Sequence, residues 1–333
     1  MDTFLPFLLV IIASFFQGSF GVGMKYMAPL KWESWWLVHV TIAMIIFPIG
    51  WAIMVVPDLF SVIGSAPGEA IRVAMLFGFL WGIGGILFGV SVPYIGLSLT
   101  YGIVMGLAAS VGSLIPLFQM EDASSNPAYP YVLLGVSIML IGVALTAWAG
   151  IKRDKATQAA DTSGNITKGI LIAASCGILS ALLNVGFVNA APVAKAAEAA
   201  GTLTRNSSLA AWVVVLLGAY GMNAGYAIFL LFKNKSWGSF GAPQSSKAYR
   251  WAIIAGLCWF AALGIYGQGS ALMGVIGPII GWPMLLGLSL IISNIWAYSS
   301  GEWKGAKQAF QILLLGLAVL IIASLVLGYS NQV

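Results

Sequence analysis

The side chains that could do chemistry in this 333-residue chain are few, and most of them are uncharged. There is one histidine, His39, and there are two cysteines, Cys176 and Cys258, which both fall inside apolar sequence. No paired-histidine, cysteine-rich or phosphate-loop spacing occurs in the sequence. General acid–base catalysis needs several titratable groups close together, and few exist here. We therefore expect neither an enzyme nor a metal site.

Amide and aromatic side chains inside apolar segments are the candidate ligand-binding residues. They are Gln17, Trp81, Asn184, Asn189, Asn223, Trp259, Tyr266 and Gln268. Amides both donate and accept hydrogen bonds, which suits hydroxyl groups. A flat indole face matches the C–H face of a pyranose ring. We expect a shared cavity for a neutral small molecule such as a sugar, although hydrogen bonding between helices is the alternative for each amide.

A second group of residues could couple ligand movement to a cation. Histidine titrates near neutral pH, and Glu33 precedes His39 by about two helical turns. Lys25 could adjust a nearby carboxylate, or it could reach toward the membrane interface. Glu33 could equally anchor the start of its helix. Because no carboxylate lies in the middle of an apolar segment, coupling to Na⁺ stays open beside coupling to a proton, and no cofactor is expected.

The composition places these residues in a polytopic, all-α membrane protein. The chain is 60% hydrophobic and 8% charged, and its mean hydropathy is +0.97. Soluble domains carry about 25% charged residues. Apolar runs of about 20 residues recur, and each can cross the hydrocarbon core as a helix. The ten predicted spans are 3–24, 35–56, 73–92, 95–117, 130–150, 169–190, 209–231, 251–270, 275–298 and 308–328.

The distribution of Lys and Arg predicts the orientation. Loops after odd-numbered spans hold twelve of the 15 basic residues, and loops after even-numbered spans hold three. Basic loops stay on the cytoplasmic side, so both termini are expected outside the cytoplasm. A lipid environment accounts for the net positive charge without a nucleic-acid partner. The oligomeric state is left open.

An internal repeat is visible in the third and eighth spans. Gly78-x-x-Trp81 is echoed by Gly256-x-x-Trp259, and further matches keep the same offset. The polar segment 151–168 divides the ten spans equally, which predicts one five-helix repeat at 1–150, a cytoplasmic linker at 151–168 and a second repeat at 169–333. Because five is odd, the second copy is inverted, as in transporters that alternate access around a midplane site.

Two further features of the sequence concern a kink in one span and the position of two others. Pro278 and Pro283 interrupt the ninth span, where they predict a kink that serves either gating or packing. The fifth and tenth spans carry almost no polar residues. We therefore expect these two spans to be peripheral and to face lipid or another subunit.

Several motifs together resemble the L-rhamnose–proton symporter family, a ten-helix branch of the drug/metabolite transporter superfamily. The motifs are Lys31-Trp32-Glu33-x-x-Trp36, Trp81-Gly82-Ile83-Gly84, Tyr94-x-Gly96, Cys176-Gly177-Ile178-x-Ser180-Ala181, Asn189-Ala190-Ala191, Asn223-x-Gly225-Tyr226 and Glu302-Trp303. The resemblance implies two inverted repeats and proton-coupled uptake of a deoxyhexose across a bacterial inner membrane. His39 stands where a small residue is expected in the family, so a role in coupling is not implied by the resemblance.

Other functions remain as alternatives. Uptake of another monosaccharide with Na⁺, or metabolite export as elsewhere in the superfamily, would use the same architecture. Export of cations would favour a buried central carboxylate, which the spans lack. A membrane enzyme would need a titratable cluster, and a sensor would need a longer cytoplasmic segment.

Overall fold

The computed structural model describes residues 4–157 and 165–332, and this part of the chain is helical without β-strands. Within these ranges, ten helical segments are long and apolar enough to cross a membrane. Each predicted span coincides with one of them, so the all-α class and the ten spans are confirmed. Of the predicted linker, residues 158–164 lie outside the described residues.

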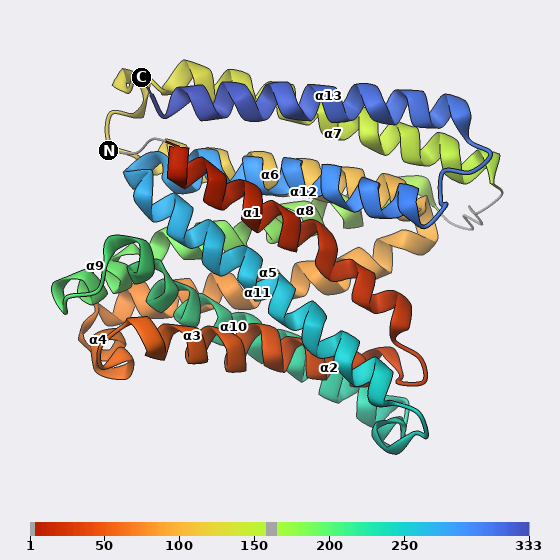
Figure 1. Cartoon of the computed structure of the whole chain (residues 1–333), viewed down its shortest axis with the longest axis horizontal. Helices are drawn as coiled ribbons and strands as arrows, with labels where there is room; N and C mark the ends of the chain where they lie inside the picture. Colours follow the sequence, from red (N-terminus) through yellow and green to blue (C-terminus); the bar gives the residue numbers. More distant parts are fainter. Residues whose placement is uncertain (1–3, 158–164, 333) are drawn as a thin grey trace. The chain divides into compact units, whose positions relative to one another are not determined.

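The helices are numbered in chain order, and short 3₁₀ or π segments carry the letter η (Figure 1). They are α1 (Phe4–Ser19), η1 (Phe20–Tyr26), α2 (Trp32–Thr41), η2 (Ile42–Ile46), α3 (Phe47–Val55), α4 (Leu59–Ser65), α5 (Gly68–Ile95), α6 (Leu97–Gln119), η3 (Ala123–Ser125), α7 (Tyr129–Ala156), α8 (Ile166–Asn189), α9 (Ala191–Ala199), α10 (Thr204–Lys233), η4 (Trp237–Gly241), α11 (Ser246–Leu272), η5 (Gly274–Ile276), α12 (Gly277–Ser299) and α13 (Lys307–Ser330).

The chain divides into two compact units that do not coincide with the two halves of the sequence. Unit 1 comprises residues 1–82 and 186–272, and unit 2 comprises residues 83–185 and 273–333. Each unit therefore contains helices from both predicted repeats. The boundaries at 82/83 and 185/186 fall inside α5 and α8, so each of these helices contributes to both units.

Unit 1 is built from α1 to α4, α9 to α11 and parts of α5 and α8. Helix α1 lies along α11, and α10 packs against α2, α9 and α11 (Figure 1). Helices α5 and α10 come unusually close. A Cβ on Gly78 would lie 2.0 Å from the carbonyl oxygen of Val215, and one on Gly218 would lie 1.9 Å from that of Met75. Glycine is required at such a backbone contact.

Helix α10 ends in a turn that matters for the site. The backbone N–H of Lys235 donates to the carbonyl of Phe232 (3.2 Å), and the N–H of Ser236 donates to the carbonyl of Leu231 (3.1 Å). This pattern is a Schellman motif, and Lys235 adopts the left-handed conformation that it needs (φ 53°). The turn fixes the positions of Asn234 and Ser236.

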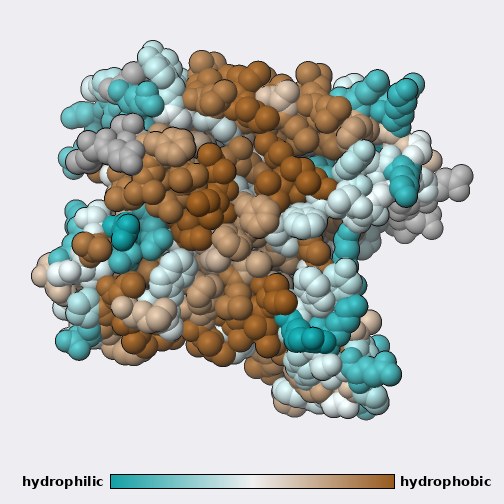
Figure 2. Space-filling view, viewed as in Figure 1, coloured by the Kyte–Doolittle hydropathy of each residue, from teal (hydrophilic) through white to brown (hydrophobic). Residues whose placement is uncertain are grey.

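Unit 2 contains the fifth and tenth spans as an antiparallel pair, α7 and α13, which lie side by side (Figure 1). Gly135 near the start of α7 meets Leu327 near the end of α13, and Gly316 near the start of α13 meets Thr146 of α7. The outward side chains of the pair are apolar, and Leu325 is 68% exposed. The surface over α13 is hydrophobic along its middle and hydrophilic toward both ends (Figure 2). This is the pattern of a lipid-facing helix.

Candidate functional site

Two predicted aromatic residues lie together in unit 1. Trp81 of α5 and Trp259 of α11 have ring centroids 5.5 Å apart, and their planes are tilted by 35°. The rings contact each other directly, so a sugar cannot lie between them in this conformation. Trp259 is buried and Trp81 is half-buried, so Trp81 offers the more accessible indole. The described residues provide no hydrogen-bond partner for either indole N–H.

Asn223 of α10 lies beside the same turn of α5. A Cβ on Gly82, the residue after Trp81, would be 3.1 Å from Nδ2 of Asn223. Helix α5 therefore brings Trp81 to the level of Asn223 through the close approach of its glycines to α10. Asn223 is 6% exposed, so its amide is largely removed from solvent. A buried amide must be paired or must await a ligand.

The hydrogen bonds of Asn223 use only part of its capacity. The indole Nε1–H of Trp36 donates to its Oδ1 (3.2 Å), and its Nδ2–H donates to the carbonyl of Ala219 (2.9 Å). The second hydrogen on Nδ2 has no acceptor among the residues that the structure describes. One donor is thus left for a ligand. Sequence reasoning had selected Asn223 but not Trp36, whose only signal was its place in the Trp-Glu-x-x-Trp motif.

The single histidine is next to this group. His39 is 1% exposed, and its ring stacks on Trp35 (5.2 Å, 9°) and packs against Trp36 (5.0 Å, 32°). Phe20 lies on it as well (6.1 Å, 24°). The side chain bonds to the backbone of Ala252, and Nδ1 has no partner among the described residues. The imidazole is therefore enclosed by aromatic rings and removed from solvent.

Lys25 and Glu33 lie at the end of η1 and in the first turn of α2. The buried carboxylate of Glu33 accepts hydrogen bonds from the Ser236 hydroxyl and from the Asn234 amide (3.1 Å). It therefore ties the start of α2 to the turn after α10, as expected for a helix anchor. Lys25 lies in the last turn of η1, where its side chain is exposed.

Tyr266 and Gln268 belong to a second group at the far end of α11. Tyr266 is fully buried, against Phe187 (5.9 Å) and Trp212 (6.2 Å). Gln268 donates from Nε2 to Oδ1 of Asn206 (3.0 Å). Both side chains thus have neighbours within unit 1 that account for their burial.

Two other predicted amides lie on α8 and α1. Asn189 is the last residue of α8 and is half-buried. Gln17 lies on α1, and its Oε1 is buried without a partner among the described residues.

In unit 2, Asn184 donates hydrogen bonds to backbone carbonyls of two other helices. It is fully buried, and its Nδ2 donates to the carbonyl oxygens of Gly112 (2.9 Å) and Pro278 (3.0 Å). In a helix, the N–H of residue 116 would bond to Gly112, but Pro116 has no N–H. Asn184 supplies the missing donor and joins α8 to α6 and α12. Helix–helix bonding, the alternative kept for each amide, thus describes this contact.

The predicted gating prolines are in the same network. Pro283 leaves the carbonyl of Ile279 without its helical donor, and the buried hydroxyl of Ser113 donates to it (2.6 Å). The indole of Trp282 donates to the carbonyl of Ala108 (2.9 Å). The first turns of α12 are therefore bonded to α6 at two points. Sequence reasoning missed Ser113, because a serine in a span usually bonds within its own helix.

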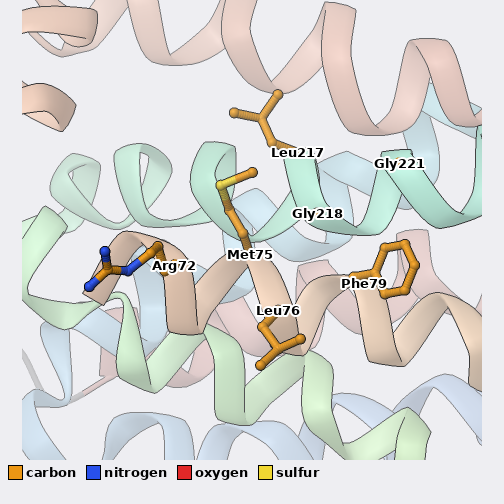
Figure 3. Close-up of a pocket in the computed structure, with 7 residues that line it drawn as sticks. All are labelled: Arg72, Met75, Leu76, Phe79, Leu217, Gly218 and Gly221. Atoms are coloured by element: carbon orange, nitrogen blue, oxygen red, sulfur yellow. The ribbon is translucent and has the colours of Figure 1, made fainter. Parts of the chain in front are cut away.

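A groove elsewhere in unit 1 contains none of the predicted site residues. It has a volume of about 400 Å³ and lies between α5 and α10 (Figure 3). Its lining is apolar except for Arg72 at one end, and comprises Arg72, Met75, Leu76, Phe79, Leu217, Gly218 and Gly221. Within residues 4–157 and 165–332, no group of three or more His, Cys, Asp or Glu side chains could hold a metal ion.

Comparison with known proteins assigns the family. The family described as L-rhamnose-proton symport protein (RhaT) matches residues 4–332. The L-rhamnose-proton symporters of Yersinia pestis (strain Pestoides F) and Yersinia pseudotuberculosis serotype O:1b (strain IP 31758) are each 28% identical to the chain over 313 residues. The matched region covers 91% of this chain and 91% of each relative. The chain therefore belongs to the L-rhamnose-proton symporter family.

Proposed function

We propose that this chain imports L-rhamnose, or a closely related neutral deoxyhexose, by symport with a cation across a bacterial inner membrane. Its family consists of secondary active transporters rather than enzymes. The relatives that match over nearly their whole length are named for L-rhamnose and proton symport. We expect no cofactor and no resident metal site, and the expected small partners besides lipid are the sugar and the coupling cation, H⁺ or Na⁺.

One observation supports the sugar site most directly. Trp81, which contacts Trp259, precedes Gly82, and Gly82 packs against the amide nitrogen of Asn223, which has an unused N–H. An indole face can cover the C–H face of a pyranose while the amide N–H bonds to one of its oxygens. The described hydrogen bonds and ring contacts of Trp81, Trp259 and Asn223 include no carboxylate, lysine or arginine, which favours a neutral ligand.

His39 is the proposed coupling residue. It is buried beside Trp36, and Trp36 in turn bonds to Asn223. Sugar and proton would thus bind to adjacent side chains of unit 1. Coupling to Na⁺ is the alternative, since amides and backbone carbonyls can form a Na⁺ site. Glu33 and Lys25 are proposed to act at the cytoplasmic end of α2 rather than at the sugar.

The proposed orientation places both termini in the periplasm. Loops after odd-numbered spans should then share the cytoplasmic side. In unit 2, Ser98 donates to Asp154 (2.6 Å), and Arg153 bonds to Glu302 (3.4 Å). Ser98 lies at the start of the fourth span, Arg153 and Asp154 follow the fifth, and Glu302 follows the ninth, so their contacts support one common side. The excess of basic residues in these loops supports assigning that side to the cytoplasm.

Alternating access between inverted repeats is part of the proposal. Gly78 of the third span packs against the backbone of the seventh, and Gly256 of the eighth packs against the carbonyl of His39 in the second. Such reciprocal contacts are expected when the two halves are related by an inverted repeat. Pro278 and Pro283 of α12 stay proposed for gating, by moving together with the helices bonded to α12, and a kink that serves only packing is the alternative.

Calorimetric binding of a sugar panel to the purified protein tests the function. L-rhamnose, L-fucose, L-lyxose and D-mannose are titrated with and without Na⁺, from acidic to alkaline pH. We expect saturable L-rhamnose binding that Trp81→Ala weakens at least about tenfold, because stacking on the indole is lost. The control Trp148→Ala removes an indole that is 49% exposed on α7, and should leave binding unchanged.

The same titrations separate the alternatives. Binding that depends on pH without Na⁺ and changes in His39→Ala supports proton symport. Binding that requires Na⁺ removes His39 from the coupling role. If no sugar binds under any condition, the proposed substrate class is wrong.

A further inference from the structure

We propose that Trp36 is a positioning residue for the sugar: its indole N–H fixes the amide of Asn223 so that an N–H, and not the oxygen, faces the ligand. This inference rests on the proposed sugar site. It concerns a contact between two spans, since the bond from Trp36 Nε1 to Asn223 Oδ1 joins residues 187 positions apart (3.2 Å).

The orientation of the amide follows from its two partners. An indole N–H can only donate, so the amide atom that faces Trp36 must be the oxygen. The carbonyl of Ala219 can only accept, so the atom that faces it must be the nitrogen (2.9 Å). A rotated amide would set N–H against N–H and oxygen against oxygen. Both partners therefore require the same orientation.

Trp36 itself is held from two sides. Its ring stacks on Trp32 (5.3 Å, 13°) and packs against His39 (5.0 Å, 32°). The direction of the indole N–H is thereby set by packing rather than by Asn223. An indole N–H that packing holds in place can orient an amide side chain that would otherwise rotate.

The fixed amide determines what the ligand must supply. After the bonds to Trp36 and Ala219, the unused donor of Asn223 is one Nδ2–H. The sugar must offer an oxygen lone pair there, from a hydroxyl group or from the ring. A free amide could turn to meet a donor or an acceptor equally well. Trp36 removes that freedom, so it contributes to selectivity without touching the ligand.

The binding test compares two conservative variants. Trp36→Phe keeps an aromatic ring but removes the N–H, and we expect about tenfold weaker L-rhamnose binding. Trp32→Phe is the matched control, because it keeps an aromatic ring against Trp36 and removes an indole N–H for which the described residues provide no hydrogen-bond acceptor. It should change binding less than about twofold. Equal losses in the two variants would show that ring packing matters rather than the N–H.

A double-mutant cycle asks whether Trp36 acts through Asn223. In an Asn223→Ala background, adding Trp36→Phe should cause no further loss of affinity. If the second substitution weakens binding as much as it does in the wild type, Trp36 contacts the sugar or acts elsewhere, and the inference is overturned.

A second readout needs no sugar. The ¹H–¹⁵N signal of the Trp36 indole is assigned by its disappearance in Trp36→Phe. It should shift and exchange faster with solvent in Asn223→Ala, because its acceptor is gone. An unchanged signal would overturn the inference even if sugar binds. If the signal changes as expected but the wild type binds no sugar, the proposed function fails and the amide is oriented for another ligand.

Discussion

Ser113 should stabilise the protein because it donates to a carbonyl that a proline has left unpaired. Its hydroxyl donates to Ile279 across α6 and α12 (2.6 Å), and Pro283 cannot supply the usual helical N–H. Removing the hydroxyl with Ser113→Ala leaves a buried oxygen without a donor. Ser113 is fully buried, so water cannot easily replace it.

The expected cost of Ser113→Ala is about 1.5 kcal/mol. Leaving a buried polar group unsatisfied costs about 1–3 kcal/mol. Hydrogen bonds between membrane helices average about 0.6 and reach about 1.7 kcal/mol. The upper part of the second range applies here, because the carbonyl of Ile279 has no N–H donor from its own helix. Only one oxygen atom is removed, so a cavity adds little.

A neighbouring serine provides the matched control. Ser110 lies on the same helix and is also buried, but its hydroxyl donates to the carbonyl of Gly106 in its own helix (2.8 Å). That carbonyl keeps its helical donor when the hydroxyl is removed. Ser110→Ala should therefore change the unfolding free energy by less than about 0.5 kcal/mol.

The assay is reversible unfolding in mixed micelles, followed by tryptophan fluorescence. The decisive comparison repeats Ser113→Ala in a Pro283→Ala background, where residue 283 regains an N–H for Ile279. The cost of losing the Ser113 hydroxyl should then fall below about 0.5 kcal/mol. If the cost is the same in both backgrounds, the compensation for proline is not what makes Ser113 stabilising, and the reasoning is refuted.

Three further substitutions test separate contacts. Gly78→Ala should lower the melting temperature strongly, because its Cβ would fall 2.0 Å from a backbone oxygen, whereas Gly85→Ala, with no atom within 4 Å, should not. Asn223→Asp should abolish sugar binding in calorimetry yet keep the Trp36 indole signal hydrogen-bonded, because a carboxylate accepts but cannot donate; retained binding would contradict the donor role. Glu33→Ala should cost about 1–3 kcal/mol in the same unfolding assay, because it leaves the buried hydroxyl of Ser236 without its acceptor; an unchanged stability would show that this hydroxyl finds another partner.

The spans were predictable from the sequence because membrane crossing depends on the length and apolarity of each helix by itself. The pairing of helices was not. Whether Asn184 bonds to a ligand or to another helix depends on where Gly112 and Pro278 lie in space, and they are 72 and 94 positions away. Composition cannot supply that distance.

The candidate site was partly predictable, because some residue types are unusual inside a single span. Trp81, Trp259 and Asn223 stood out because large aromatic and amide side chains are unusual deep in a span. Trp36 did not stand out, since a tryptophan near the start of a span is common at the interface. Its significance comes from the bond to Asn223, which only the fold reveals.

The hydrogen bonds around the prolines of α12 limit how this helix can move. Bonds from Asn184, Ser113 and Trp282 join the first turns of α12 to α6 and α8 within unit 2. Breaking all three would cost about 2–5 kcal/mol at the strengths measured between membrane helices. A hinge at Pro278 or Pro283 that separated α12 from α6 would have to meet this cost in every transport cycle. We therefore expect any movement of α12 to carry α6 and α8 with it, so that the kink shapes a packed group of helices instead of flexing inside it.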